Sequence, residues 1–219
     1  MDILLIMKPK YICIILIAIN NLLQYFIPEY ENCTMISYGG YSGFWYYYSN
    51  LQKNYFLDKS IYCYSAGCLA TVASIQHNNY NSLINMVKTI RNKYNDNEIN
   101  RFDIRNEFIY KISEKVTDIK YYNINILTSS YYGNCNIIRP TNKEELINAL
   151  NMTTSLPFIT SKLNMSQNID GFFCLNKYPK CKEKFTIPNT LYFYINIFNH
   201  NINDADISYL MNYIKKIEK

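Results

Sequence analysis

Short apolar segments alternate with longer amphipathic ones from Asn32 onward, and this alternation limits the possible folds more than any other feature of the sequence. The short runs are typical of buried strands, and the longer segments repeat their apolar residues with a helical period. Strands that alternate with helices predict an α/β domain with a mainly parallel central sheet covered by helices. The expected strands are residues 34–38, 60–64, 122–127, 134–138 and 191–197.

Helices are expected between these strands. An aromatic helix is expected at 44–55, and Thr141-Asn-Lys-Glu144 is typical of a capping box that starts a helix toward Leu150. Two helices with apolar faces come before it, and a final amphipathic helix is expected from about Asp204. Their apolar faces comprise Leu83, Met86, Val87 and Ile90, then Phe108, Ile109 and Ile112, and finally Ile207, Leu210, Met211, Ile214 and Ile217.

Length and composition favour one globular domain. Of 219 residues, 49% are hydrophobic and only 18% are charged, which excludes a solvated disordered chain. The net charge of +5 comes from scattered Lys and Arg, with no basic and aromatic stripe along a helix, so nucleic acid is not an expected partner. We expect the single lysine cluster to be a solvated loop, with attraction to an anionic lipid surface as the alternative. It comprises Lys177, Lys180, Lys182 and Lys184.

Residues 1–28 are interpreted as a signal peptide or membrane anchor, and 29–219 as the folded domain. The apolar run 11–19 follows Lys8 and Lys10, which is the layout of a signal sequence. If the two following asparagines are tolerated, the apolar stretch reaches residue 27 and is long enough for one membrane helix. A buried first helix is the alternative. The first two interpretations predict a membrane-associated or secreted protein.

The seven cysteines include no CxxC pair, and the only histidines, His77 and His200, are far apart in sequence. A metal site is therefore not expected. Cys174 and Cys181 could close a small disulfide loop in an oxidising compartment. Buried free thiols are the alternative.

A strand-to-helix corner at Cys63-Tyr64-Ser65-Ala66-Gly67 is the strongest chemical signal. A nucleophilic serine needs its hydroxyl lifted clear of the backbone, and a sharp corner between a strand and a helix does this. Small neighbours are required at such a corner, and Gly67 allows the helix to pass close to the strand. The alternative is a serine that only caps the helix.

A second glycine-rich corner precedes this one. It consists of Gly39, Gly40, Tyr41, Ser42 and Gly43, at the end of the first expected strand. Backbone N–H groups in such a turn can converge on an anion, such as the oxyanion of an acyl-transfer intermediate. Taken alone, the same glycines would favour a simple tight turn.

The third signal is the stretch 155–159, Ser-Leu-Pro-Phe-Ile, followed by Asp170-Gly171. Together the signals resemble the patatin-like phospholipases, including their adiponutrin-like branch. That family has a glycine-rich oxyanion turn, a G-x-S-x-G elbow, an Ala/Ser-x-x-Ile-Pro stretch and a D-G-G/A motif in this order. The similarity runs from Ile36 to Gly171.

The resemblance implies a three-layer α/β/α patatin-like fold and a serine hydrolase that acts on carboxylic esters of lipids. It implies Ser65 as nucleophile, Asp170 as its base, and neither a histidine nor a cofactor. The expected substrate is a phospholipid or another acyl lipid at a membrane surface. The implied oxyanion residues are Gly39, Gly40, Tyr41, Ser42 and Gly43, and the implied elbow residues are Cys63, Tyr64, Ala66 and Gly67.

Four positions depart from the family pattern. Tyr38 replaces the first glycine of the oxyanion run, Ser42 stands where Arg or Lys is common, and Cys63 replaces the first glycine of the elbow. Phe172 replaces the second glycine of D-G-G. A membrane-associated lipid-binding or scaffold protein that keeps the fold without activity is therefore one alternative function. A neutral-lipid or lysophospholipid esterase with the same dyad is another.

Overall fold

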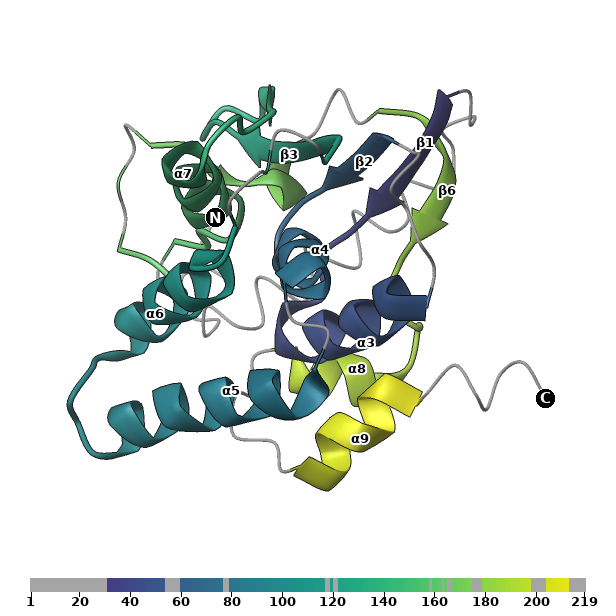
Figure 1. The fold of residues 1–219 in the computed structure, drawn as a ribbon. Helices are drawn as coiled ribbons and strands as arrows, with labels where there is room; N and C mark the ends of the chain where they lie inside the picture. The colour runs from purple at the N-terminus through teal and green to yellow at the C-terminus, as the bar shows by residue number, and fades with distance from the viewer. Residues whose placement is uncertain are drawn as a thin grey trace, which may run out of the picture.

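The chain folds as an α/β domain around a six-stranded, mostly parallel sheet (Figure 1). The computed structural model describes residues 31–53, 60–76, 79–116, 119, 122–157, 159–162, 164, 167–174, 179–197 and 204–212. The elements are β1 (Glu31–Ile36), α3 (Gly40–Lys53), β2 (Ser60–Cys63), α4 (Ala66–Gln76), α5 (Tyr80–Asn95), α6 (Arg101–Ser113), β3 (Ile124–Ser129), β4 (Cys135–Ile138), α7 (Lys143–Thr153), β5 (Ile169–Asp170), the 3-10 helix η2 (Gly171–Phe173), β6 (Cys181–Phe185), α8 (Leu191–Asn196) and α9 (Asp204–Asn212).

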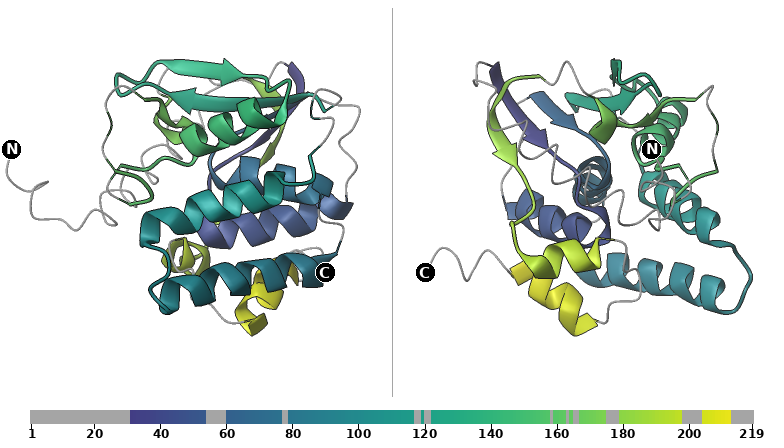
Figure 2. Two further views of the ribbon diagram at one scale, coloured as in Figure 1. Left: turned by 60° about the vertical axis from the view of Figure 1, so that its left-hand side comes forward. Right: turned by 180° about the vertical axis from the view of Figure 1, so that it is seen from behind.

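The strand order is β4-β3-β2-β1-β6, with β5 paired to β3. β1 is parallel to β2 and β6, and β2 is parallel to β3, whereas β4 and β5 are antiparallel to β3. The α/β class and the mainly parallel sheet predicted from the sequence are thus confirmed. Because β1, α3, β2, α4 and β3 proceed across the sheet in one direction, right-handed crossovers put α3 and α4 on the same face. The left view of Figure 2 shows the sheet at the top and the described helices gathered beneath it.

An aromatic-rich helix forms the centre of the core. In α3 the side chains of Trp45, Tyr47 and Tyr48 are fully buried. Phe44 packs edge to face on Trp45 and on Phe108 of α6, with ring centroids 5.1 Å apart in each pair. The helix begins at Gly40, four residues before the predicted start at 44, because the glycine turn itself forms its first turn.

Residues 191–197 were predicted as a strand, and this prediction is wrong: Leu191–Asn196 is the helix α8. Periodicity does not distinguish a buried strand from a short helix in an apolar run. The helical period is visible only in the burial, since Phe193 and Ile197 are buried while Leu191 and Ile195 are exposed. Phe193 packs on Tyr46 of α3, with ring centroids 5.5 Å apart.

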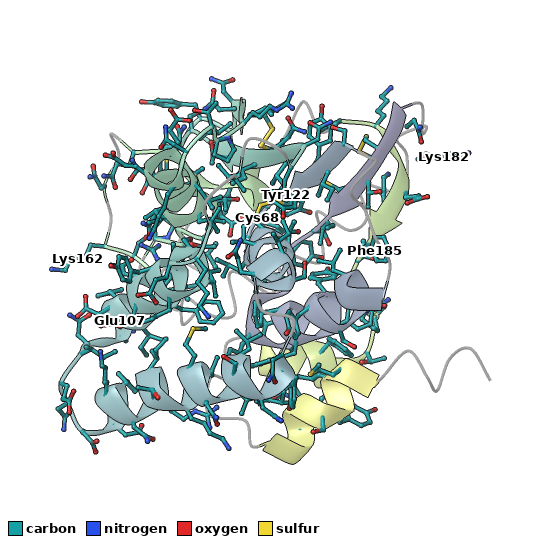
Figure 3. All side chains as sticks on the ribbon, in the orientation of Figure 1. Cys68, Glu107, Tyr122, Lys162, Lys182 and Phe185 are labelled. Carbon is teal, nitrogen blue, oxygen red and sulfur yellow. A yellow bond between two sulfur atoms is a disulfide. The ribbon has the colours of Figure 1, made fainter. Side chains whose placement is uncertain are left out.

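The lysine cluster does not lie in a loop as predicted. Lys182 and Lys184 belong to β6, which pairs with β1 at the edge of the sheet, and both are exposed. Figure 3 shows Lys182 at the outer edge of the molecule. Lysines on an edge strand discourage pairing with other chains. Lys180 directly precedes the strand, and Lys177 lies outside the described residues.

The start of α7 differs from prediction by one residue. Asn142, not Thr141, is the N-cap, and its side chain accepts a hydrogen bond from the Glu145 N–H. Thr141 is held instead by the Glu145 carboxylate, which accepts from its N–H and its hydroxyl.

Three disulfides join the chain: Cys33 to Cys181, Cys63 to Cys68, and Cys135 to Cys174. A bridge between Cys174 and Cys181, one of the two alternatives above, is therefore excluded. The reason is topological, because Cys181 lies opposite β1 and Cys174 lies beside β4. Free thiols, the other alternative, are excluded for these six residues.

None of the described helices is long and apolar enough to cross a bilayer. The predicted signal peptide or anchor, 1–28, lies outside the described residues, as do His77 and His200.

Candidate active site

The corner at Ser65 has the geometry that was predicted for a nucleophile. β2 ends at Cys63, α4 begins at Ala66, and Ser65 between them has a φ of 54°. Non-glycine residues rarely adopt this left-handed conformation, which costs about 1–2 kcal/mol. Strain of this kind is a frequent property of functional corners. A Cβ on Gly67 would lie 2.4 Å from the Ser37 carbonyl oxygen, so only glycine allows α4 to pass this close to the end of β1.

Asp170 reaches the same place by sheet register. β4 pairs with one edge of β3 over residues 126–129, so β2 and β5 share the other edge. On this edge Cys63 of β2 lies opposite Ile126, and Asp170 of β5 lies opposite Thr128. β5 therefore continues where β2 stops, and Asp170 lies beside the turn that carries Ser65.

The Asp170 carboxyl is buried, and only one of its two oxygens makes a hydrogen bond. The side chain is 1% exposed, its Oδ1 accepts from the Phe172 N–H at 2.9 Å, and its Oδ2 has no partner at full hydrogen-bond geometry. Burial raises the pKa of Asp170 to about 7, against the lowering effects of the Phe172 N–H, the Ser65 hydroxyl and the Arg105 charge. The Ser65 hydroxyl thus lies within reach of the carboxyl without a fully formed hydrogen bond. Loose geometry between a nucleophile and its base is common before substrate binds.

The last residue of α7 and the segment that follows it hold both candidate residues. The Ser65 N–H donates to the Thr153 carbonyl at 3.1 Å and to the Thr153 hydroxyl at 3.0 Å. That hydroxyl in turn donates to the Leu127 carbonyl at 2.6 Å. Two residues on, the Ser155 carbonyl accepts the Asp170 N–H at 3.0 Å. The 155–159 stretch noted in the sequence therefore lies against the base, and the residues just before it fix the nucleophile.

The glycine turn leads into the first turn of α3, beside Ser65. Gly40 has a φ of 54°, and a Cβ there would lie 2.1 Å from the Ile197 carbonyl oxygen. The five predicted oxyanion residues are not equivalent. The Tyr41 N–H already donates to Ile197 at 2.7 Å, and the Gly43 N–H donates to Gly39 at 2.8 Å.

The N–H groups of Gly39, Gly40, Ser42 and Ala66 make no hydrogen bond to the described residues, and of these four residues only Gly40 and Ala66 line the cavity. Gly40 begins α3 and Ala66 begins α4, and both residues line the same cavity as Ser65. Ala66 was predicted as an elbow residue, and its N–H follows the nucleophile directly. This pair is best placed to donate to an oxyanion formed at Ser65.

A cavity of about 460 Å³ opens in front of Ser65. Its described walls combine many apolar side chains with three arginines and contain no acidic residue. Such a combination is typical of sites that bind a small molecule with an apolar body and a few polar groups. The apolar wall includes Phe44, Leu69, Val87, Ile90, Ile104, Phe108, Leu156 and Ile159.

The departures from the motif pattern are accommodated in the structure. Cys63 is bonded to Cys68, which ties the end of β2 to the first turn of α4 on either side of Ser65. Tyr38 and Phe172 pack edge to face, with ring centroids 5.2 Å apart. The Ser42 hydroxyl donates to the Phe193 carbonyl at 2.9 Å. Phe172 also contributes the N–H that binds Asp170, so its bulk does not displace the carboxylate.

Sequence reasoning missed two residues of the site, Thr153 and Arg105. Thr153 lies two residues before the 155–159 motif, but no pattern indicates that its hydroxyl anchors the elbow. Arg105 lies on α6, lines the cavity, and interacts electrostatically with Asp170. Arg101 and Arg105 are spaced four residues apart, which indicates only that they share a helix face.

No protein-family model, curated protein or solved structure matches the chain.

Proposed function

We propose that the protein is a lipid acyl hydrolase with a Ser65-Asp170 dyad, of the patatin-like phospholipase type. The observation that carries the proposal is the meeting of two side chains: Ser65, which lies in a strained corner and lines the cavity, and the buried Asp170 carboxyl that its hydroxyl can reach. A serine that only capped a helix would need neither the left-handed backbone nor an acid beside it. A pKa of about 7 also suits a group that must accept and return a proton near neutral pH.

The reaction follows from this geometry. Asp170 accepts the Ser65 proton as the serine oxygen attacks the ester carbonyl, and the N–H groups of Gly40 and Ala66 bind the resulting oxyanion. The tetrahedral intermediate expels the alcohol part of the lipid, which takes the proton from Asp170, and an acyl-enzyme remains. Water then attacks the acyl-enzyme as Asp170 accepts its proton, and the fatty acid leaves when Ser65 is reprotonated. Loss of one oxyanion donor raises the barrier of such reactions by about 3 kcal/mol.

The test is covalent labelling with a fluorophosphonate, which reacts with activated serines. We expect labelling of the folded wild-type protein at Ser65, none in Ser65→Ala, and at least about a hundredfold slower labelling in Asp170→Asn. Ser74→Ala is the matched control, because Ser74 lies on the same helix and its hydroxyl donates to the Thr71 carbonyl. Unchanged labelling of Asp170→Asn would remove Asp170 from the mechanism. A folded wild-type protein that is not labelled would refute the hydrolase.

A further inference from the structure

Arg105, one of the three arginines that line the cavity in front of Ser65, forms no ion pair with the described residues. Arg105 is half-buried, and the described residues place no carboxylate within ion-pair distance of it. Its guanidinium donates to the Asn106 side chain at 3.1 and 3.3 Å and, weakly, to the Thr154 carbonyl at 3.5 Å. A guanidinium that lines a cavity and has only neutral hydrogen-bond partners among the described residues is suited to bind an anionic ligand.

Arg105 lies close to the place where the ester must be. It donates to Thr154, the neighbour of the residue that holds the Ser65 N–H. Arg105 also interacts with the charge of Asp170: burial lowers the pKa of Arg105, and the Asp170 carboxylate raises it. An anion on Arg105 would therefore share the cavity with an ester carbonyl at Ser65.

The rest of the cavity supports a single ligand with an apolar body and an anionic group. Arg91 of α5 and Arg101 of α6 line the same cavity. No acidic residue in its described wall competes with an anionic ligand for these arginines. The volume of about 460 Å³ is in the lower part of the range for ligand cavities. A guanidinium binds phosphate through two parallel N–H donors, which an ammonium does not.

From these contacts we propose that Arg105 binds the phosphate of the substrate and that the preferred substrates are acyl lipids with a phosphate close to the ester. The inference rests on the proposed function and makes it more specific. Arg105 is a specificity-determining residue in this account. The shared chemistry is an oxyanion beside an acyl chain, so a free fatty acid is the competing ligand to be distinguished.

Binding is tested without turnover in the Ser65→Ala protein. Trp45, the only tryptophan, packs edge to face on Tyr41 and Phe44, which both line the cavity, so its fluorescence reports ligand entry. The probes are 1-O-hexadecylglycerol 3-phosphate, hexadecylglycerol and hexadecanoate, all below their aggregation concentrations. We expect the ether phosphate to bind at least about tenfold tighter than the other two, and Arg105→Gln to remove this difference. Equal binding of the phosphate and the neutral lipid, or tighter binding of hexadecanoate, would overturn the proposal.

Turnover gives the second test, with palmitoyl esters of glycerol 3-phosphate and of glycerol. At a pH above the inflection of the pH profile in both proteins, Arg105→Gln should lower kcat/KM for the phosphate ester by about 10- to 100-fold, mostly through KM, and change the neutral ester by less than about threefold. Arg105→Lys should recover only part of the loss. Arg139→Gln is the matched control, because Arg139 is exposed and does not line the cavity. Equal losses on both esters would give Arg105 another role and refute the phosphate site, while Ser65 labelling in the same variant shows separately that the hydrolase stands.

Discussion

The rings of Tyr38 and Phe172 pack edge to face, with centroids 5.2 Å apart. Tyr38 lies beside the glycine turn and Phe172 lies beside the candidate base, and at both positions the pattern expected from the sequence has a glycine. Both are buried, and their contact connects the end of β1 to η2 behind Asp170. The two side chains therefore stabilise each other's position through this contact, and neither residue lines the cavity.

Replacement of Phe172 by Ala should destabilise the fold. We expect the free energy of unfolding to fall by about 3–5 kcal/mol, as for other buried aromatic side chains. A double-mutant cycle with Tyr38→Ala should give a coupling of about 0.5–1.5 kcal/mol. Urea denaturation measures both quantities. Tyr132→Ala, at an 85% exposed ring, should change stability by less than about 0.5 kcal/mol, and a coupling near zero would contradict the pairing.

The pH dependence of hydrolysis should report Asp170. Its pKa is raised to about 7 by burial, so below that pH the carboxyl is protonated and cannot accept the Ser65 proton. The value of kcat/KM should fall about tenfold per pH unit below 7 and level off above it. Because the Arg105 charge lowers this pKa, Arg105→Gln should move the inflection to higher pH, and Arg139→Gln should not. A flat profile from pH 5 to 8 would exclude Asp170 as the base.

The raised pKa of Asp170 also predicts how stability depends on pH. From the unfolded value near 3.8 up to about 7, the native state keeps a proton that the unfolded state has lost. Wild-type stability should therefore decrease as the pH rises through this window, by about 2–4 kcal/mol in total. Asp170→Asn lacks this charge, so it should match the wild type near pH 4 and exceed it at pH 8. Urea denaturation at both pH values measures the difference, and an Asn variant that is less stable at pH 8 would show that the carboxylate is not destabilising.

The parts of the site that depend on local sequence were predictable. Small residues at 65–67 and glycines at 39–43 specify two corners, and the order of the motifs selected Asp170. The parts that depend on tertiary contacts were not. Thr153 reaches the site because α7 packs on β3, and Arg105 reaches it because α6 packs on α4 and α7. No spacing in the sequence encodes that packing.

The same distinction explains the errors in the fold. Residues 191–197 are apolar enough for a strand, but they form a helix because Phe193 and Ile197 find partners on one side only. The pairing of Cys33 with Cys181 depends on β6 returning beside β1, which no cysteine spacing reveals.

The Cys63–Cys68 disulfide should be required for Ser65 to react. It joins the residues on either side of the corner, and both cysteines are fully buried. Without the bridge, the strained backbone at Ser65 is held only by its hydrogen bonds to Thr153 and by packing of α4. The double variant Cys63→Ala/Cys68→Ala should remain folded and show at least about tenfold slower fluorophosphonate labelling.

The matched control is the disulfide Cys33–Cys181, which joins β1 to β6 away from the cavity. It closes a much longer loop, of 148 residues against 5, so its removal should lower the free energy of unfolding more, by about 2–5 kcal/mol. Labelling of Cys33→Ala/Cys181→Ala should nevertheless stay near the wild-type rate wherever that variant is folded. The two variants therefore separate stability from positioning. Loss of Cys33–Cys181 should mainly lower the free energy of unfolding, and loss of Cys63–Cys68 should mainly slow the labelling of Ser65. Slower labelling in proportion to lost stability in both variants would show that the elbow bridge stabilises the fold and does not position Ser65.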